Sequence, residues 1–366
     1  MTMYPPHGRP RRGPVVLAAL VVVAVVAAGV GLAVFWSPQV SGSAVPIAEK
    51  PGFVTVDGSP VAFRDLPRIA QATFIRSTDP CGFITPEQLR AIGSPATLEP
   101  DSINTCQASI NVGQKYDADV YISFAVRPPD EDSSNSKFFT ETMSDQAVVF
   151  EDGSLDCTAS IEIQPPADPR FTARGDTPGI TRPATAVWLQ IKRSTSDASR
   201  PGCDLTRKLA APAAKTVSSK QFPVRKQGPQ VAPIVGRDPC AITRKLPAGT
   251  SMTAWQPSND TGVNKCALTL GTEKSPVAVN VVYALRTEGG MASDREGLTA
   301  SDIGGRTVFS QEQNGGCVFT TTAGKATSFA GGGSTEPTLY YPIVVVGGPC
   351  DTARQLLPIV ATLAEK

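Results

Sequence analysis

The sequence predicts an α+β fold in which two tandem disulfide-stapled domains follow one N-terminal transmembrane helix. Each domain is expected to be a mostly antiparallel sheet with flanking helices. Three observations lead to this prediction: a long uncharged segment near the N-terminus, two matching sets of four cysteines, and β-branched runs between the cysteines. The sets are Cys81, Cys106, Cys157 and Cys203, then Cys240, Cys266, Cys317 and Cys350. Corresponding cysteines are 159, 160, 160 and 147 residues apart, which indicates a duplication.

The uncharged segment covers residues 15–36 and is mostly aliphatic. At a rise of about 1.5 Å per residue, a helix of this length crosses a hydrocarbon core of about 30 Å. Three arginines precede the segment, and no charged residue follows it until Glu49. This bias of basic residues predicts that residues 1–14 form a cytoplasmic tail and that the rest of the chain is extracytoplasmic.

A cleaved secretory signal is the alternative interpretation of the N-terminus, because Gly42, Ser43 and Ala44 could form a small-residue cleavage site. The apolar region of such a signal is usually only about 7 to 15 residues long, so length favours the uncleaved anchor. Both interpretations export the same domains.

Composition divides the exported part into four segments. Residues 37–68 are rich in Pro, Gly and Ser and are expected to form a stalk, and residues 211–233 contain four prolines and are expected to form a linker. The first four-cysteine domain is then 69–210 and the second is 234–366, sizes that suit one hydrophobic core each.

Alternation and β-branched runs predict four or five strands in each domain. In the first domain they cover 108–112, 120–126, 148–150, 158–163 and 184–191, and in the second 267–270, 277–285, 307–310, 318–322 and 339–346. A turn before the third cysteine of each set predicts an antiparallel hairpin there. These turns are Asp152-Gly153-Ser154 and Asn314-Gly315-Gly316.

Helices are expected at both ends of the unit. Thr85-Pro86-Glu87-Gln88 has a capping hydroxyl, a proline at the first helical position and a glutamine three residues after the cap. The corresponding stretch of the second unit meets Pro247, so its helix is expected to be shortened or lost. After the fourth cysteine, both units read C-D-x-x-R-x-L, and Asp204 and Asp351 are expected to cap a C-terminal helix.

An even number of cysteines in an exported chain predicts four disulfides. Four cysteines allow three pairings, and the sequence alone does not choose among them. Pairing of neighbours is favoured, because neighbouring cysteines flank single elements that a disulfide could join. The favoured pairs are Cys81–Cys106, Cys157–Cys203, Cys240–Cys266 and Cys317–Cys350.

Several classes of chemistry are disfavoured. The single histidine, His7, lies before the apolar segment, and the chain has no C-x-x-C pair, so Ser-His-Asp or Cys-His catalysis and structural zinc are not expected. No metal or cofactor is predicted. A net charge of +1, from 34 basic and 33 acidic residues, argues against a nucleic-acid partner.

Weaker motifs have simpler interpretations. Ser134-x-x-Lys137 lacks the S-D-N and K-T-G elements of penicillin-recognising enzymes, and acidic residues 130–132 lack the ligand spacing of a calcium loop. Glycine-containing stretches 323–326 and 331–334 are interpreted as turns, because the phosphate-binding motif G-x-x-x-x-G-K-[ST] is absent. Trp188 could stack on a sugar or peptide, but its apolar strand favours core packing; for Trp255 the choice stays open.

The opening Asp79-Pro80-Cys81, followed by Thr85-Pro86-Glu87-Gln88-Leu89, resembles a family of exported actinobacterial domains of unknown function, many of them lipoproteins. The four-cysteine arrangement is also similar to extracellular sensor modules of mycobacterial receptor kinases. This chain differs in having a membrane anchor, two copies and no kinase domain. The resemblance implies an envelope protein and supplies no catalytic residues.

The resulting expectation is a single-pass membrane protein that binds or senses a cell-wall or glycolipid ligand, or an envelope protein, without being an enzyme. A structural partner that stabilises an envelope or secretion complex is the first alternative. An uncommon cell-wall hydrolase is the second, because paired carboxylates in space cannot be recognised from sequence spacing.

Overall fold

The computed structural model describes residues 53–366 with gaps at 57–58, 63–64, 94–97, 112–116, 127, 130–135, 154–155, 167–185, 196–202, 226–231, 233, 248–249, 258–262, 273, 296 and 330–337. The expected cytoplasmic tail, 1–14, and transmembrane segment, 15–36, lie outside these residues. Among the helices that are described, none combines the length and apolar character needed to cross a bilayer. All described residues belong to one compact region, Val45–Lys366, which contains both four-cysteine units.

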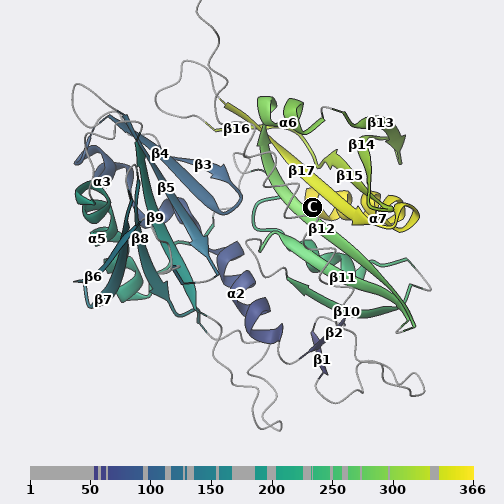
Figure 1. Cartoon of the computed structure of the whole chain (residues 1–366), viewed down its shortest axis with the longest axis horizontal. Helices are drawn as coiled ribbons and strands as arrows, with labels where there is room; N and C mark the ends of the chain where they lie inside the picture. Colours follow the sequence, from purple (N-terminus) through teal and green to yellow (C-terminus); the bar gives the residue numbers. More distant parts are fainter. Residues whose placement is uncertain are drawn as a thin grey trace, which may run out of the picture. The chain divides into compact units, whose positions relative to one another are not determined.

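The first sheet has seven antiparallel strands in the order β3-β4-β5-β9-β8-β7-β6 (Figure 1). Their bounds are β3 Glu99–Ser102, β4 Thr105–Asn111, β5 Asp117–Ala125, β6 Lys137–Met143, β7 Gln146–Asp152, β8 Asp156–Ile163 and β9 Val187–Thr195. The five expected strands correspond to β4, β5, β7, β8 and β9. The edge strands β3 and β6 were not expected.

The second sheet has eight antiparallel strands in the order β10-β11-β12-β17-β15-β14-β13, with β16 paired to β17. Their bounds are β10 Met252–Pro257, β11 Lys265–Thr272, β12 Ser275–Thr287, β13 Thr299–Ile303, β14 Arg306–Gln313, β15 Gly316–Thr322, β16 Thr327–Phe329 and β17 Thr338–Gly348. Again the five expected strands are present, and the edge strands β10 and β13 and the short strand β16 are additional.

The two sheets share one strand order. When β3 to β9 are matched in sequence order to β10 to β15 and β17, every neighbouring pair of the first sheet has its counterpart in the second. Registers agree as well, because Cys106 lies opposite Ile122 as Cys266 lies opposite Val281. The expected hairpins before Cys157 and Cys317 are β7-β8 and β14-β15.

Each sheet packs its core face against a helix that follows its fourth cysteine. These helices are α5, Asp204–Ser219, and α7, Cys350–Glu365. Leu209 and Leu356, the leucines of the shared C-D-x-x-R-x-L motif, are both buried there. The expected capping by Asp204 and Asp351 is wrong: the residues at the N-caps are Cys203 and Pro349, neither of which makes a side-chain cap hydrogen bond.

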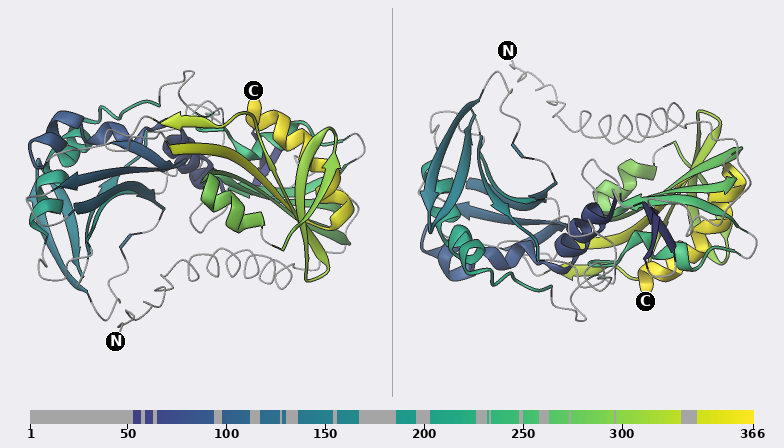
Figure 2. Two further views of the ribbon diagram at one scale, coloured as in Figure 1. Left: turned by 90° about the horizontal axis from the view of Figure 1, so that it is seen from above. Right: turned by 90° about the horizontal axis from the view of Figure 1, so that it is seen from below.

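Short helices complete each sheet. The first has η3, Pro80–Phe83, and α3, Pro86–Arg90, whose Thr85 and Gln88 form the expected capping box. The second has η4, Pro239–Arg244, with no described helix in the place of α3. It also has α6, Glu288–Arg295, which lies on the opposite face of the sheet from α7 (Figure 2).

The segments expected to be a stalk and a linker contain regular structure. Strands β1, Phe53–Val56, and β2, Ser59–Ala62, form a hairpin, and helix α2 spans Leu66–Ser77. These elements begin before residue 69, so the folded region starts inside the expected stalk. Helix α5 likewise continues to Ser219, past the expected start of the linker at 211.

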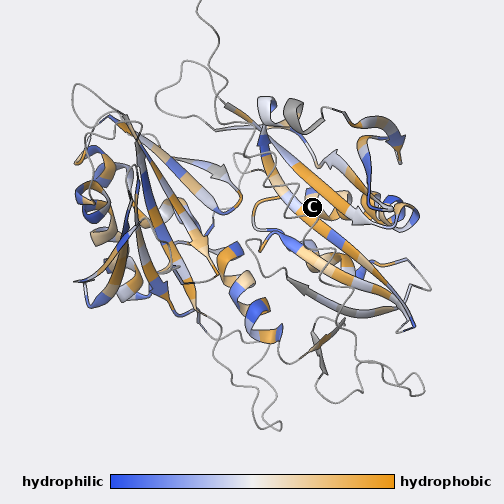
Figure 3. Ribbon diagram, in the orientation of Figure 1, coloured by the Kyte–Doolittle hydropathy of each residue, from blue (hydrophilic) through white to orange (hydrophobic). Residues whose placement is uncertain are grey.

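Two hydrophobic cores result, one beside each sheet. Apolar residues follow the central strands β12 and β17 of the second sheet in particular (Figure 3). Helix α2 contributes to both cores: Leu66 and Ile69 pack in the second, whereas Phe74 and Ile75 pack in the first. Because helix α2 is buried against both sheets, it holds the two sheets together.

Candidate functional site

The four disulfides have the favoured connectivity. Their pairs are Cys81–Cys106, Cys157–Cys203, Cys240–Cys266 and Cys317–Cys350, with sequence separations of 25, 46, 26 and 33 residues. The first pair of each set joins a short helical loop to a strand, and the second joins a strand to the start of the C-terminal helix. Every bridge therefore closes within one set of four cysteines.

The Asp-Pro-Cys motif is explained by local geometry. Asp79 Oδ1 accepts a hydrogen bond of 3.0 Å from the backbone N–H of Cys81, and Asp238 Oδ1 accepts one of 2.9 Å from that of Cys240. In each motif, the proline between the aspartate and the cysteine is the first residue of a 3₁₀ helix. A backbone N–H at this position has no partner within the helix, so its absence in proline costs nothing. The motif thus fixes the cysteine that bonds to the neighbouring strand.

The arginine of C-D-x-x-R anchors the C-terminal helix to its sheet in both units. Arg207 lies over the rings of Phe139 and Phe150 at 5.9 and 5.6 Å and donates hydrogen bonds to both carboxylate oxygens of Glu141. Arg354 lies over Phe319 at 5.8 Å. These contacts between a guanidinium and ring faces are structural, since they join a helix to the strands beneath it.

Strand β9 presents the most suitable surface for a ligand. Val187, Leu189 and Ile191 are fully buried in the first core. Because successive residues of a strand point to opposite faces, Trp188, Gln190 and Lys192 lie on the face away from that core. Trp188 and Gln190 are partly buried and Lys192 is exposed. The favoured interpretation of Trp188 as a core residue is therefore wrong.

Neighbouring strands extend this surface. On β5, Tyr121 lies opposite Lys192 and Ser123 lies opposite Gln190. On β8, Glu162 lies opposite Trp188. We call these six residues, Trp188, Gln190, Lys192, Tyr121, Ser123 and Glu162, the stacking face. At about 3.3 Å per residue, the distance along β9 from Trp188 to Lys192 is about 13 Å.

The stacking face combines an aromatic ring at each end with amide, hydroxyl and charged groups between and beside them. The Nζ atom of Lys192 lies 2.7 Å from Asp156 Oδ2 at the edge of the face, and both side chains are more than a third exposed. A surface ion pair of this kind positions the lysine but contributes little stability. The chemistry offered is ring stacking and hydrogen bonding, which suits binding of a polar, ring-containing molecule.

The corresponding face of the second sheet has different chemistry. By register, Val345 and Ile343 of β17 occupy the positions of Gln190 and Trp188, and Val282 of β12 occupies that of Ser123. Val282 and Val345 are partly buried. The two sheets thus share a fold but present a polar aromatic face in one case and an aliphatic face in the other.

Trp255 lies in the second core. Its side chain is 7% exposed, and its indole Nε1 is buried without a hydrogen-bond partner among the described residues. It cannot stack on a ligand from this position. The structure therefore separates the two tryptophans: Trp188, for which core packing was favoured, lies away from the core, and Trp255, whose role was left open, lies within it.

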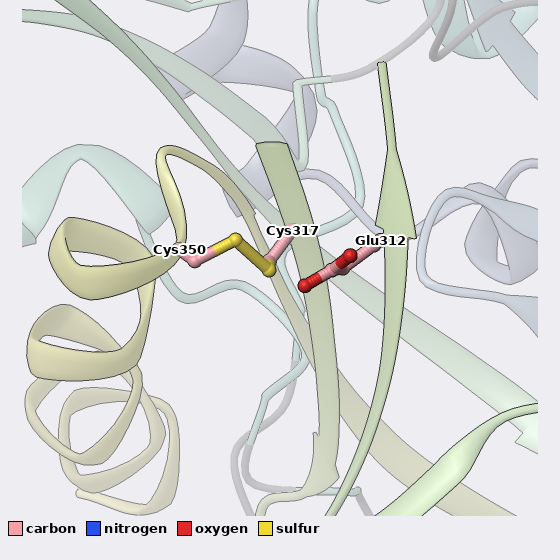
Figure 4. Close-up of side chains that lie close together, drawn as sticks. All are labelled: Glu312, Cys317 and Cys350. Carbon is pink, nitrogen blue, oxygen red and sulfur yellow. A yellow bond between two sulfur atoms is a disulfide. The ribbon is translucent and has the colours of Figure 1, made fainter. Parts of the chain in front are cut away.

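One group of potential metal ligands occurs among the described residues. Glu312, Cys317 and Cys350 have ligand atoms within 4.8 Å of one another (Figure 4). Both cysteines belong to one disulfide, and Glu312 lies opposite Cys317 across the β14-β15 pair. Because the thiolate is the form of cysteine that binds metals, this group is a disulfide beside a carboxylate and not a metal site.

The remaining sequence motifs show no assembled site. Of Ser134-x-x-Lys137, only residues 136 and 137 are described, and Lys137 begins β6. Acidic residues 130–132 and glycine-containing residues 331–334 lie outside the described residues, as does His7. Gly324, at the end of β15, has a φ of 92°, consistent with the expected turn.

Comparison of the chain with protein-family models, with curated proteins and with solved structures found no match.

Proposed function

We propose that this protein is a membrane-anchored, extracytoplasmic binding or sensing protein of an actinobacterial cell envelope, built from two tandem copies of one domain. Four disulfides and no free cysteine among the described residues support an oxidising location. The shared strand order of the two sheets and their matching disulfides support the duplication. The uncharged segment 15–36 supports the anchor.

We further propose that the ligand is a cell-wall glycan fragment or the sugar headgroup of a glycolipid, and that it binds on the stacking face. The observation that carries this proposal is the position of Trp188 on the side of β9 away from the core. A buried tryptophan would be expected from the apolar strand around it, yet Trp188 is only partly buried and lies on the same face as Gln190 and Glu162. Aromatic rings with adjacent amides and carboxylates bind sugars through ring contact and hydroxyl hydrogen bonds.

A second function, as a structural partner in an envelope or secretion complex, is supported by the aliphatic face of the second sheet. Val282, Val345 and Val318 lie on this face, and each is only partly buried. Apolar residues in such a position favour contact with another protein over contact with a polar ligand. The two functions are compatible, since they use different sheets.

The glycan proposal is tested by Trp188→Ala in the full chain, purified in detergent. Calorimetric titration with soluble muramyl-peptide fragments and with a dispersed envelope glycolipid should give a dissociation constant for the unmodified chain. A tryptophan that anchors a ligand contributes about 2 kcal/mol, so the variant should bind about 30-fold more weakly.

The matched control is Phe309→Ala, which removes a partly buried ring from the corresponding face of the second sheet. It should leave glycan binding unchanged. If neither glycan bound the unmodified chain, or if Phe309→Ala weakened binding as much as Trp188→Ala, the stacking face would be excluded as the site.

A photo-crosslinking residue at position 282 tests the second function, with the same residue at position 190 as its control. A structural partner on the aliphatic face should be captured in cells from position 282 and not from position 190. Equal capture from both positions would contradict a partner specific to this face.

A further inference from the structure

The chain segments that precede the two sheets pair with each other. Thr78, at the end of α2, forms an isolated antiparallel bridge with Val224, which follows α5. The N–H of Asp79 donates to the carbonyl of Pro223 at 2.8 Å, and the N–H of Arg225 donates to the carbonyl of Ser77 at 2.9 Å. Gly82 allows close approach here, since a Cβ at that position would lie 2.3 Å from Pro223 Cβ.

From this pairing, Arg76 extends to the second sheet. Its Nη1 donates a buried hydrogen bond of 3.0 Å to the carbonyl of Val263, in the turn between β10 and β11. Its Nη2 lies 3.3 Å from Asp238 Oδ2, and the arginine side chain is only 7% exposed. Asp238 is the aspartate of the second Asp-Pro-Cys motif, whose other oxygen already fixes Cys240.

Arg225 extends in the reverse direction, to the first sheet. Its Nη2 donates a hydrogen bond of 3.3 Å to Asn104 Oδ1, in the turn between β3 and β4. Burial lowers the pKa of Arg225 to about 10, and the nearby carboxylate of Asp79 acts against this lowering. Asp79 is the aspartate of the first Asp-Pro-Cys motif. Arg76 thus contacts the Asp-Pro-Cys motif and the β10-β11 turn of the second sheet. Arg225 lies near the Asp-Pro-Cys motif of the first sheet and contacts its β3-β4 turn.

Apolar residues are exchanged in the same reciprocal way. Ile103, in the β3-β4 turn, is 2% exposed and belongs to the core of the second sheet. Val263, in the β10-β11 turn, is 4% exposed and belongs to the core of the first. Both residues lie three positions before the second cysteine of their set, so equivalent positions of the two units make equivalent contacts.

We propose that the two units bind each other as an internal dimer through a crossed interface formed by Arg76, Arg225, Ile103 and Val263 with the paired segments at Thr78 and Val224. The partner that this surface fits is the other unit of the same chain. The interface buries a charged and an apolar group from each side in reciprocal positions, an arrangement expected of an isologous dimer interface. A covalent connection between the units is then not required for their association.

Cleavage between the units tests this proposal directly. A protease site inserted between Lys220 and Gln221, at the exposed end of α5, would separate the two sets of four cysteines and leave Val224 and Arg225 on the second fragment. No disulfide joins the two sets. After complete cleavage under non-reducing conditions, both fragments should elute together from a sizing column at micromolar concentration, with the mass of one intact chain.

The contribution of the arginines is measured on the cleaved protein. Arg76→Met removes one partner of the buried charge pair with Asp238 and should raise the dissociation constant of the fragments about 30-fold or more. Arg225→Met removes a hydrogen bond from a charged group to the Asn104 amide and should raise it about 10-fold or more. Arg90→Met is the matched control, because Arg90 is exposed and forms an exposed ion pair with Glu87. It should leave the dissociation constant unchanged.

Three outcomes would overturn the proposal. The first is separation of the unsubstituted fragments at tens of micromolar. The second is a complex with twice the mass of the chain, which would indicate exchange between two molecules. The third is dissociation in Arg90→Met equal to that in the other variants. The unsubstituted cleaved chain decides the matter even if an arginine variant fails to fold.

Discussion

Two bidentate ion pairs show how single residues attach helices to strands of their sheets. Arg207 of α5 contacts Glu141 of β6, and Arg306 of β14 donates to both oxygens of Glu365 at the end of α7, at 2.6 and 2.8 Å. In each pair, hydrogen bonds from the guanidinium lower the pKa of the carboxyl group. The two pairs do not occupy equivalent positions in the two sheets, so each helix is held by different residues.

In the Glu365→Gln variant, the free energy of unfolding should depend less on pH in the acidic range. Because the pKa of Glu365 is lower in the folded chain than in the unfolded one, its stabilising effect is present above the unfolded value of about 4.3 and is lost as pH falls through the folded value. The variant should cost about 1 kcal/mol at pH 7 and progressively less below about pH 4. Urea unfolding between pH 3 and 7 measures the difference.

Glu312→Gln is the control for this prediction, because Glu312 is exposed and lies beside the Cys317–Cys350 disulfide. It should change stability little across the same range. A constant difference between the unmodified chain and Glu365→Gln at all pH values would contradict the role of the ionised carboxylate.

Residue roles were predictable where local chemistry decides them. The Asp-Pro-Cys loop and the Thr85 capping box follow from hydrogen bonds within a few residues. The position of Trp188 was not predictable. The residues of this strand alternate between two faces of the sheet, but the sequence does not show which of the two faces the core. Asp204 was misassigned because the helix begins one residue earlier than expected, and it accepts instead from Arg207 at 2.8 Å.

At the scale of elements, the capping box of α3 offers a direct comparison between the units. Thr85→Ala removes the oxygen that accepts from the N–H of Gln88 and should cost about 1 kcal/mol. Thr243→Ala is its counterpart in the second unit, where the hydroxyl donates to the carbonyl of Cys240 and caps no α-helix. Chemical unfolding should show the larger loss for Thr85→Ala, and equal losses would contradict the capping function.

Most of the strands that were missed share one cause. β3, β6, β10 and β13 are the edge strands of the two sheets, and on β13 all residues but Ile303 are exposed. Edge strands bury little surface, so their hydrophobic pattern is weak and the pairing partner determines the structure. The central strands were predictable because they are paired on both sides and bury many apolar residues, which gives a clear hydrophobic pattern in the sequence.

At the scale of the whole molecule, the shared helix α2 should make the two units unfold together. Replacing Cys157 and Cys203 by alanine removes a bridge with a separation of 46 residues, which costs about 4 kcal/mol in the chain-entropy model. Although this bridge lies in the first unit, we expect the midpoint of unfolding to fall equally in both, because Leu66 and Phe74 of one helix belong to different cores.

Tryptophan fluorescence can follow the units separately. In the background that lacks the Cys157–Cys203 disulfide and carries Trp36→Phe, Trp188→Phe leaves Trp255 to report on the second unit, and Trp255→Phe leaves Trp188 to report on the first. Coincident thermal transitions would support coupled unfolding. A transition at Trp255 that stays at its original temperature while that at Trp188 falls would show that the units unfold independently.

The division of the cysteines into two sets was predictable from their spacing, whereas the contact between the two sheets was not. Ile103 and Val263 lie in turns and give no periodic signal, and the segment before Arg225 has the proline content of a linker. Only the tertiary fold shows that these residues are buried.

The dual membership of α2 has a consequence for biogenesis. Ribosomes deliver the N-terminus first, so Leu66 and Ile69 emerge long before the strands β10 to β12 that cover them. Until those strands arrive, the nascent polypeptide exposes an apolar helix surface, which must be shielded from aggregation. Maturation of the N-terminal portion is therefore expected to finish only after the last strands have been made.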